Sequence, residues 1–153
     1  MNTAFSAADF LIIPVDAGFF ALMGIKELLA EVSEIKTATN QRLKVLGYLL
    51  TLADHTKMTE ETWDGLISSF GKQVFETKIR RTVKLREAPA IGKTIFHHDP
   101  EGAGSQDYFS LAQEVLTRLT QMNYIAEKNE VNIHNSQPNQ TPVLSLVSEV
   151  GHG

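Results

Sequence analysis

Continuous apolar runs alternate with amphipathic stretches along the first half of the chain, and their lengths fit strands and helices. Residues 10–15 (FLIIPV) form a continuous apolar run between Asp9 and the turn residues DAG, which is typical of a strand buried on both faces of a parallel sheet. Residues 45–52 (VLGYLLTL) form a second run rich in strand-forming residues. The pattern therefore predicts two buried strands, and Pro14 marks the end of the first.

Each of these strands is followed by a segment with helical periodicity. Apolar residues recur every three or four positions over 22–35, with Glu and Lys on the other side, which predicts an amphipathic helix of about five turns. A second helix is predicted over 59–70, with Thr59 as its N-cap and Gly71 as its C-cap. The order of strand, helix, strand and helix favours helices that cover a parallel sheet.

The next part of the chain mixes a short strand signal with turn residues. Residues 74–79 (VFETKI) alternate as a third strand, and residues 95–102 (IFHHDPEG) favour extended chain and turn. After a turn at 102–105 (GAGS), apolar residues at helical spacing predict a last helix over 107–122. These elements predict an α/β fold with a partial, open, mostly parallel sheet and flanking helices.

The 153 residues, of which 42% are hydrophobic, are enough for one domain with a real core. We place that domain at residues 1–125. From about residue 127 onward Asn, Gln, Ser and Pro dominate, so residues 126–153 are predicted to be a disordered tail.

Charge is segregated along the chain. The net charge is −4, but residues 72–93 contain seven of the fourteen Lys and Arg residues and only two Glu residues, so this segment carries +5 and the remainder −9. A local excess of this kind favours contact with an anionic partner. The chain has no cysteine, the N-terminus lacks the positive region of a signal peptide, and no apolar run is long enough to span a membrane. An intracellular protein without a membrane span is the simplest interpretation.

Gly92-Lys93-Thr94 spells the end of a phosphate-binding Walker A loop. The first glycine of that loop would lie five positions earlier, where this chain has Glu87, whose carboxylate repels phosphate. Pro89 removes an N–H donor, and the following residues do not favour the helix that should receive the phosphates. We therefore do not interpret this tripeptide as a phosphate loop.

Other catalytic or metal-binding patterns are weak. His97, His98 and Asp99 are adjacent, and neighbours in an extended chain point to opposite sides, so they would not chelate one ion together. The five His residues do not form a nucleophile, base and orienting group with recognisable spacing. The sequence predicts neither a metal site nor catalytic residues.

Three stretches resemble a known family. Residues 9–29 (DFLIIPVDAGFFALMGIKELL), residues 46–54 (LGYLLTLAD) and residues 75–108 (FETKIRRTVKLREAPAIGKTIFHHDPEGAGSQDY) resemble the C-terminal half of ParA-type partition ATPases, the ParA/MinD/Soj branch of deviant Walker A proteins. The resemblance covers roughly residues 4–119. Its most specific part is the run R-x-V-K-L-x-E-A-P-x-x-G-K at 81–93.

The resemblance implies a P-loop NTPase-like fold that binds ATP with magnesium, binds DNA without sequence preference, and segregates plasmids or chromosomes with a ParB-like centromere-binding partner. It also implies a cytoplasmic, nucleoid-associated bacterial protein. In the family, the Walker A and Walker B motifs lie in the N-terminal half, and the present chain begins just after their expected place. We therefore expect a truncated form that neither holds ATP and magnesium nor hydrolyses ATP by itself.

The resemblance also implies which residues would contact the nucleotide. The family loop that touches adenine usually reads Ile-Pro-Arg-Asn/Asp, whereas this chain has Ile79-Arg80-Arg81-Thr82. Arg81 could still stack on a purine. Thr51 and Asp54, at the end of the second strand, resemble another part of the base pocket, although a strand end and a turn explain them equally well. The predicted nucleotide-binding residues are Thr51, Asp54, Arg80, Arg81 and Thr82.

Lys84 and Arg86 align with the basic stripe through which the family contacts DNA. Together with Arg81 and Lys93 they form the predicted DNA-binding set, which suits phosphate contact more than base reading. A solvated basic face is the alternative, and the acidic residues of the 59–70 helix favour it.

The resemblance leaves the role of such a chain open. It could supply adenine-side and DNA-backbone contacts, act as a non-catalytic regulatory or dimerisation module that pairs with itself or with a full-length relative, or be an inert gene fragment. In each case we expect the 10–15 strand to lie at an open sheet edge, which favours association.

Overall fold

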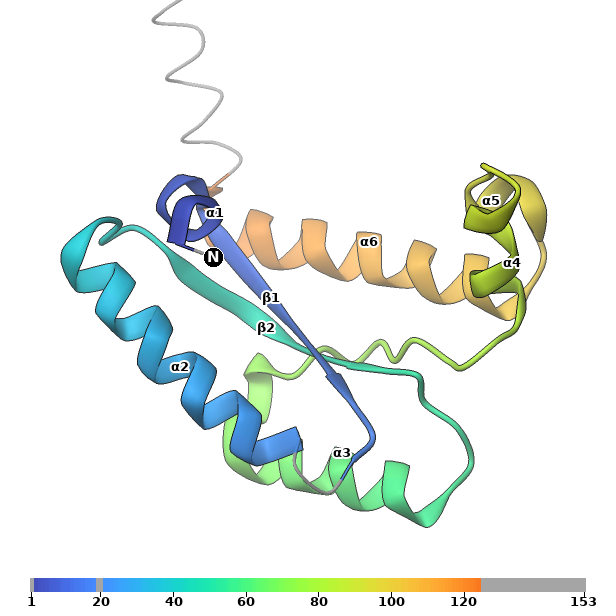
Figure 1. The fold of residues 1–153 in the computed structure, drawn as a ribbon, viewed down its shortest axis with the longest axis horizontal. Helices are drawn as coiled ribbons and strands as arrows, with labels where there is room; N and C mark the ends of the chain where they lie inside the picture. Colours follow the sequence, from blue (N-terminus) through green and yellow to red (C-terminus); the bar gives the residue numbers. More distant parts are fainter. Residues whose placement is uncertain (1, 19–20, 125–153) are drawn as a thin grey trace, which may run out of the picture. The chain divides into compact units, whose positions relative to one another are not determined.

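The computed structural model describes residues 2–18 and 21–124. The chain divides into two compact units, Met1–Arg118 and Leu119–Gly153, and only the first six residues of the second unit are described. The predicted tail at 126–153 lies outside the described residues, and the domain boundary stays a prediction. The elements, shown in Figure 1, are α1 (Asn2–Ala7), β1 (Phe10–Asp16), α2 (Ala21–Ala38), β2 (Lys44–Thr51), α3 (Lys57–Phe70), the 3₁₀ turn η1 (Gly71–Gln73), α4 (Lys84–Ala90), α5 (Ile95–His98) and α6 (Ala103–Gln121).

β1 and β2 form a parallel pair, as the apolar pattern predicted. Ile13 lies opposite Tyr48 and Pro14 opposite Leu49, so the first strand continues past the proline at which we expected it to end. Among the described residues β1 pairs with β2 alone, which confirms the expected open edge. The α/β class with a small parallel sheet and flanking helices is therefore correct.

The predicted strand at 74–79 is wrong in part. The segment lies beside β2, with parallel bridges from Tyr48 to Val74 and from Ala53 to Arg80, but it does not form a continuous strand. Between the bridges, the N–H groups of Phe75 and Ile79 still donate to carbonyls of β2, at 2.9 Å each. The N–H groups of Glu76 and Thr77 donate instead to the carboxylate of Glu114, at 2.9 and 3.0 Å. A side chain of α6 thus takes over hydrogen bonds that a regular strand would give to its neighbour.

Most of the core lies on the face of the sheet covered by α2 and α3 (Figure 1). Ile13 and Val15 of β1 are only 3% and 4% exposed, and they pack with Ile25 of α2 and Leu66 of α3. Interior-facing residues recur about every 3.6 positions on a helix and every second position on a strand, and both sets meet in this cluster. It is the part of the molecule that the sequence pattern predicted best.

The other face is covered more thinly. A Cβ on Gly47 would lie 2.7 Å from the Arg118 guanidinium of α6, so α6 approaches the sheet where a side chain is missing. Ile12, opposite Gly47, is only half-buried, and Pro14 is exposed. The expectation that β1 is buried on both faces is therefore wrong, because α6 covers the sheet beside β2 and leaves β1 partly open.

Several helix boundaries differ from the predicted ones. The N-cap of α3 is Thr56, whose hydroxyl accepts from the Thr59 N–H, while Gly71 is the C-cap as predicted. The stretch at 95–102 begins with the single helical turn α5, not with extended chain, because Ile95 is buried and the Ser105 hydroxyl donates to its carbonyl. α6 begins inside the expected GAGS turn, where Gly104 packs closely against the side chain of Ile95.

Candidate functional site

A cavity of about 880 Å³ opens beyond the C-terminal end of β2. Its walls come from the β2–α3 connection, the first half of α3, the segment that follows η1, and the first residue of α6. We call it the Trp63 cavity. The side chains that its chemistry depends on are those of Asp54, Glu60, Trp63, Asp64, Glu76, Lys78, Arg80 and Arg81.

Asp54 closes the turn that leads into α3. Its Oδ1 accepts from the Thr56 hydroxyl at 2.6 Å, from the Thr59 hydroxyl at 2.7 Å and from the Thr56 N–H at 3.2 Å. The hydrogen bonds from Thr56 and then Thr59 lower the pKa of Asp54 from its usual value, with a smaller contribution from the charge of Arg81. Asp54 therefore stays anionic while it holds the start of the helix.

Trp63 is the aromatic wall of the cavity. It is half-buried and packs on the α2–α3 core, and the ammonium nitrogen of Lys78 lies 3.7 Å from the centroid of its ring. This distance is well within the range of a cation–π contact. Glu60, nearly one helical turn before Trp63, and Asp64, directly after it, also line the cavity.

Arg80 is held in an internal ion pair. Its Nη2 lies 2.7 Å from Oδ1 of Asp107, its Nε donates to the same carboxylate, and its backbone N–H donates to Oδ2 at 2.9 Å. Asp107 is buried, and the hydrogen bond to its carboxylate raises the pKa of Arg80. The side chain of Arg81 is exposed, although its backbone N–H donates to the Ala53 carbonyl at 2.9 Å.

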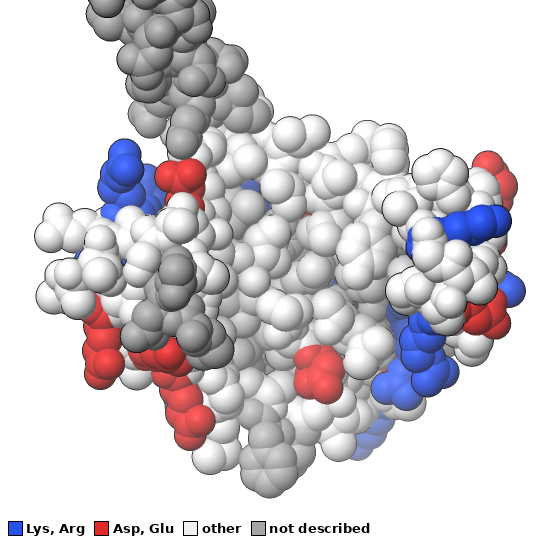
Figure 2. Space-filling model, turned by 45° about the horizontal axis from the view of Figure 1, so that its top comes forward, with Lys and Arg blue, Asp and Glu red and all other residues white. Residues whose placement is uncertain are grey.

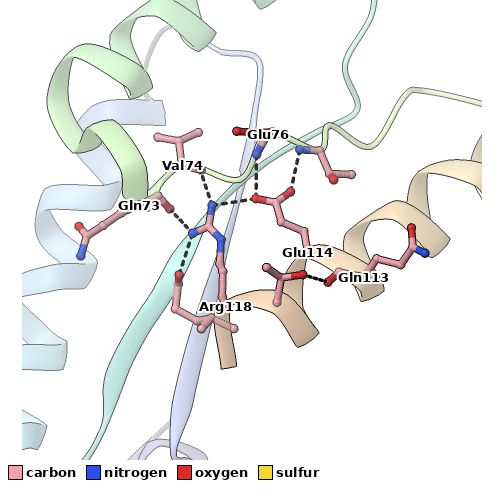
Figure 3. A network of polar contacts seen from close by, with 9 residues as sticks. Gln73, Val74, Glu76, Gln113, Glu114 and Arg118 are labelled. Carbon is pink, nitrogen blue, oxygen red and sulfur yellow. Dashed lines mark hydrogen bonds and ion pairs between the residues drawn. The ribbon is translucent and has the colours of Figure 1, made fainter. Parts of the chain in front are cut away.

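A second network fixes the segment between η1 and the cavity (Figure 3). Arg118 of α6 donates to the carbonyls of Leu46 (3.0 Å), Gln73 (3.1 Å) and Val74 (2.7 Å), and its Nη2 lies 2.8 Å from Oε1 of Glu114. Glu114 accepts from the backbone N–H groups of Glu76, which lines the cavity, and of Thr77. We call this the Glu114–Arg118 clamp, and it sets the path of the chain that carries Lys78, Arg80 and Arg81.

The basic residues predicted to contact DNA lie at and around α4. We call Arg81, Lys84, Arg86 and Lys93 the basic strip; all four are exposed. Figure 2 shows Lys and Arg side chains gathered, with some acidic ones, on the side of the molecule where Figure 1 places α4 and α5. Within the part of the chain that the structure describes, neither Arg86 nor Lys93 forms an ion pair.

Lys84 is less available than its neighbours. Its ammonium lies 2.8 Å from Oε2 of Glu87, and the same oxygen is 3.1 Å from Nε2 of His98. The contacts with Lys84 and then His98 lower the pKa of Glu87, and the hydrogen bond to Glu87 raises the pKa of Lys84. One carboxylate thus neutralises part of the strip.

The predicted nucleotide-binding residues divide into two groups. Asp54, Arg80 and Arg81 line the Trp63 cavity, whereas Thr51 and Thr82 do not. The Thr51 hydroxyl donates to the Val15 carbonyl at 3.3 Å and so joins the two strands, and the Thr82 hydroxyl accepts from the Lys84 N–H at 3.2 Å. Their assignment to a nucleotide stays a prediction.

The two adjacent histidines point to different partners. The Nδ1 of His97 lies 2.8 Å from the Thr94 hydroxyl, whereas His98 contacts Glu87. Over residues 2–18 and 21–124 there is no cluster of three or more His, Cys, Asp or Glu side chains that could hold a metal ion. In the same residues, none of the helices combines the length and the apolar character needed to cross a membrane.

The sequence pattern did not indicate the side chains that fix both regions. Asp107, Glu114 and Arg118 lie on one predicted helix, but their partners are 27 to 72 residues away. The spacing of four residues between Glu114 and Arg118 was the one visible signal, and it indicates a pair on a helix without naming the carbonyls and N–H groups that the pair binds.

Comparisons with known proteins agree on one family. A family model described as an AAA domain matches residues 1–45. The chain is 41% identical over 117 residues to the chromosome-partitioning ATPase Soj of Thermus thermophilus, covering 76% of this chain and 47% of that protein. It is 35% identical over 116 residues to the chromosome partitioning protein ParA of Caulobacter vibrioides, covering 75% and 43%. It is 36% identical over 113 residues to the sporulation initiation inhibitor protein Soj of Bacillus subtilis, covering 73% and 45%.

The chain spans a little under half the length of the curated relatives that it matches. The matched lengths also agree with the extent of the resemblance that the motifs indicated, which ran from about residue 4 to 119. The chain belongs to the ParA/MinD/Soj-type family of partition ATPases.

Proposed function

We propose that this chain is a ParA-like chromosome- or plasmid-partitioning protein whose basic strip contacts the phosphate backbone of DNA without reading its base sequence. The observation that carries the proposal is the set of exposed cations Arg81, Arg86 and Lys93, of which the last two form no ion pair in the described ranges. Charges that are not neutralised internally can release counterions from DNA when they bind phosphates.

The residue types of the strip support backbone contact. Base reading needs side chains aligned in a groove, usually on a helix or ribbon that enters it. The strip instead lies on α4, a helix of seven residues that contains Pro89, and on the loops at both of its ends. Scattered Lys and Arg on short elements favour sequence-independent binding.

ATP hydrolysis by this polypeptide alone is not part of the proposal. The 153 residues contain the Gly92-Lys93-Thr94 tripeptide but no complete Walker A loop. Gly92 has a φ of 66° in the turn after α4, and the tripeptide is followed only by the four-residue helix α5. The relatives named as ATPases are about twice as long as the matched region. We expect no magnesium-dependent release of phosphate from ATP in a purified sample.

The DNA proposal is tested by fluorescence anisotropy on two labelled duplexes of unrelated sequence across a series of salt concentrations. Both duplexes should bind equally, and the logarithm of the binding constant should fall linearly with the logarithm of salt concentration. The slope should correspond to about three phosphate contacts, at roughly −0.9 for each. Binding that ignores salt, or that depends on the duplex sequence, would contradict the proposal.

The matched variants are Arg86→Ala/Lys93→Ala and the control Lys26→Ala/Lys36→Ala. The control removes the same charge from exposed positions of α2, which lies on the other side of the molecule from α4 (Figure 1). The first pair should reduce the salt slope by about two, since each lost phosphate contact removes roughly 0.9. If both pairs weaken binding equally, net charge and not the strip carries the affinity, and the site assignment is wrong.

A further inference from the structure

β1 has a free edge with backbone groups that a further strand can pair with. In the described ranges β1 is hydrogen-bonded to β2 alone. The carbonyl of Val15 faces β2, because the Thr51 hydroxyl donates to it at 3.3 Å. Since backbone groups of successive strand residues point to alternate sides, those of Pro14 and Ile12 face the free edge. The edge therefore offers the N–H and carbonyl of Ile12 and the carbonyl of Pro14 to a neighbour, and the missing N–H of the proline is tolerated there.

An apolar groove of about 510 Å³ lies along the same edge. One wall is the second half of β1, residues 13–16, and the other wall is formed by Ala21, Gly24, Ile25 and Leu28 of α2. A Cβ on Gly24 would meet nothing within 4 Å, so the space above this part of the helix is open. The groove has room for more than one apolar side chain, and neither β1 nor α2 fills it.

The opposite face of β1 is also incompletely covered. Ile12 is half-buried and Pro14 is exposed, although parallel sheets are normally covered on both faces. A strand beside β1 would place alternate side chains on the two faces of the sheet. One set would enter the groove next to α2, and the other set would lie beside Ile12. The element that fits this edge is therefore a strand with apolar side chains on both faces.

A second copy of the chain does not meet this requirement. If two β1 strands paired about a two-fold axis, Pro14 of each copy would face the other strand without an N–H to donate. Ile13 and Val15 of the second copy are 3% and 4% exposed, because they already pack in their own core. They cannot also enter the groove of the first copy. A second copy thus brings a second groove and no side chains to fill either one.

The relatives indicate where such a strand comes from. β1 and α2, which form the groove, lie within residues 1–45, the segment that matches the AAA domain model. The matched region is 47% of Soj from Thermus thermophilus, so more than half of that protein lies outside it. We propose that the free edge of β1 binds a strand of a separate polypeptide that corresponds to this remaining part of a ParA/Soj protein. One domain then forms from two chains, by addition of a strand to a sheet edge. The proposal does not depend on DNA binding by the basic strip.

The full 153-residue chain is co-expressed with a tagged polypeptide that comprises the part of Thermus thermophilus Soj outside the matched region. The two should co-purify as a one-to-one complex by size-exclusion chromatography with light scattering. Hydrogen exchange followed by mass spectrometry should show slower exchange of the β1 peptide in the complex, because the Ile12 N–H gains a partner, and unchanged exchange of α4. Absence of a complex, a complex without added protection of β1, or self-association of the chain in its place would overturn the proposal.

Gly24→Leu separates docking from folding. The added side chain points into open space in the isolated chain, and leucine is a better helix former than glycine, so the urea midpoint of the chain alone should not fall. In the complex the same side chain occupies the groove, so the amount of chain that co-purifies with the Soj polypeptide should fall roughly tenfold. The control Ala30→Leu adds the same side chain at an exposed position of α2 outside the groove and should leave co-purification unchanged. Equal losses from both variants, or no loss from Gly24→Leu, would show that the groove does not receive the partner strand.

Discussion

The Trp63 cavity and the basic strip are built from the same stretch of chain, yet they differ in which charges are neutralised internally. In the cavity, Arg80 is paired with Asp107 and Lys78 lies over the Trp63 ring, so most of the charges without an ion-pair partner among the described residues are carboxylates. In the strip, the carboxylate of Glu87 is paired with Lys84 and close to His98, so cations are left.

The comparison shows why the charge of a sequence segment does not locate a binding surface. Residues 72–93 carry +5, but three of their seven cations already contact other side chains of the chain. Lys78 lies over the Trp63 ring, Arg80 is paired with Asp107, and Lys84 is paired with Glu87. Three of the four carboxylates that line the cavity lie outside this segment, two of them on α3 and one in the turn before it. A surface is anionic or cationic according to the charges that remain after internal pairing, because a paired charge presents little field to a ligand.

Arg118→Ala should have the largest effect and should disturb both regions together. The guanidinium binds three carbonyls and the Glu114 carboxylate, and it stacks 4.0 Å from the centre of the Phe75 ring. Its loss leaves these groups unsatisfied, so the free energy of unfolding should fall by about 2 to 3 kcal/mol. Urea unfolding followed by Trp63 emission measures the change.

The control for Arg118→Ala is Arg42→Ala, which removes an exposed guanidinium with no ion pair among the described residues. Its stability should stay within about 0.5 kcal/mol of the unchanged protein. If the two variants unfold at the same urea concentration, the Glu114–Arg118 clamp does not hold the chain between the cavity and the sheet.

Acid should loosen the Glu114–Arg118 clamp. Burial alone would raise the pKa of Glu114, but the N–H groups of Thr77 and Glu76 and the Arg118 guanidinium outweigh it, so the pKa is lowered. A lowered folded-state pKa means that the stabilisation is complete above the ordinary value near about 4.3 and is lost as the pH falls through the folded value. Urea unfolding between roughly pH 6 and pH 3 should therefore show a loss of stability, which Glu114→Gln removes in part.

A pH profile of Glu114→Gln identical in shape to that of the unchanged protein would contradict this assignment. The variant should also be less stable near neutral pH, because an amide presents one acceptor oxygen where the carboxylate receives two backbone N–H groups.

Glu87→Gln should have the smallest effect, and it should change the basic strip without changing the Trp63 cavity. Loss of the carboxylate frees Lys84 for phosphate, so DNA affinity at low salt should rise by roughly two- to fourfold. Glu101→Gln removes the same charge from an exposed residue without an ion pair in the described part of the chain. Equal gains from both variants would show a general charge effect.

Local periodicity predicted the elements around the larger core. β1, α2, β2 and α3 were all expected, because each buries residues at its own period and the core cluster draws on all four. The elements after residue 74 were predicted poorly. α5 exists because Ile95 is buried against the start of α6. No helix was predicted over α4, which has Pro89 in its last turn.

The candidate sites were predicted as residue types more than as surfaces. The motif at 81–93 contains the four residues of the basic strip. Two residues of the loop at 79–82, Arg80 and Arg81, line the Trp63 cavity. The helical period over 59–70 indicates which side of α3 Trp63 lies on, but not that its ring borders a cavity lined by carboxylates. The pairing of Lys84 with Glu87 was within reach, since three residues on a helix bring such side chains together, but no helix was predicted there.

The sequence by itself determined the α/β class, the two parallel strands with their helices, the family, and the concentration of basic residues between 72 and 93. The tertiary structure alone decided which of those charges are available. Periodicity is a property of neighbours within a few positions, whereas Arg80, Glu76 and Leu46 meet their partners across 27, 38 and 72 residues. The field at a surface depends on such distant pairings, because each one removes a charge or a hydrogen-bonding group from what a ligand can reach.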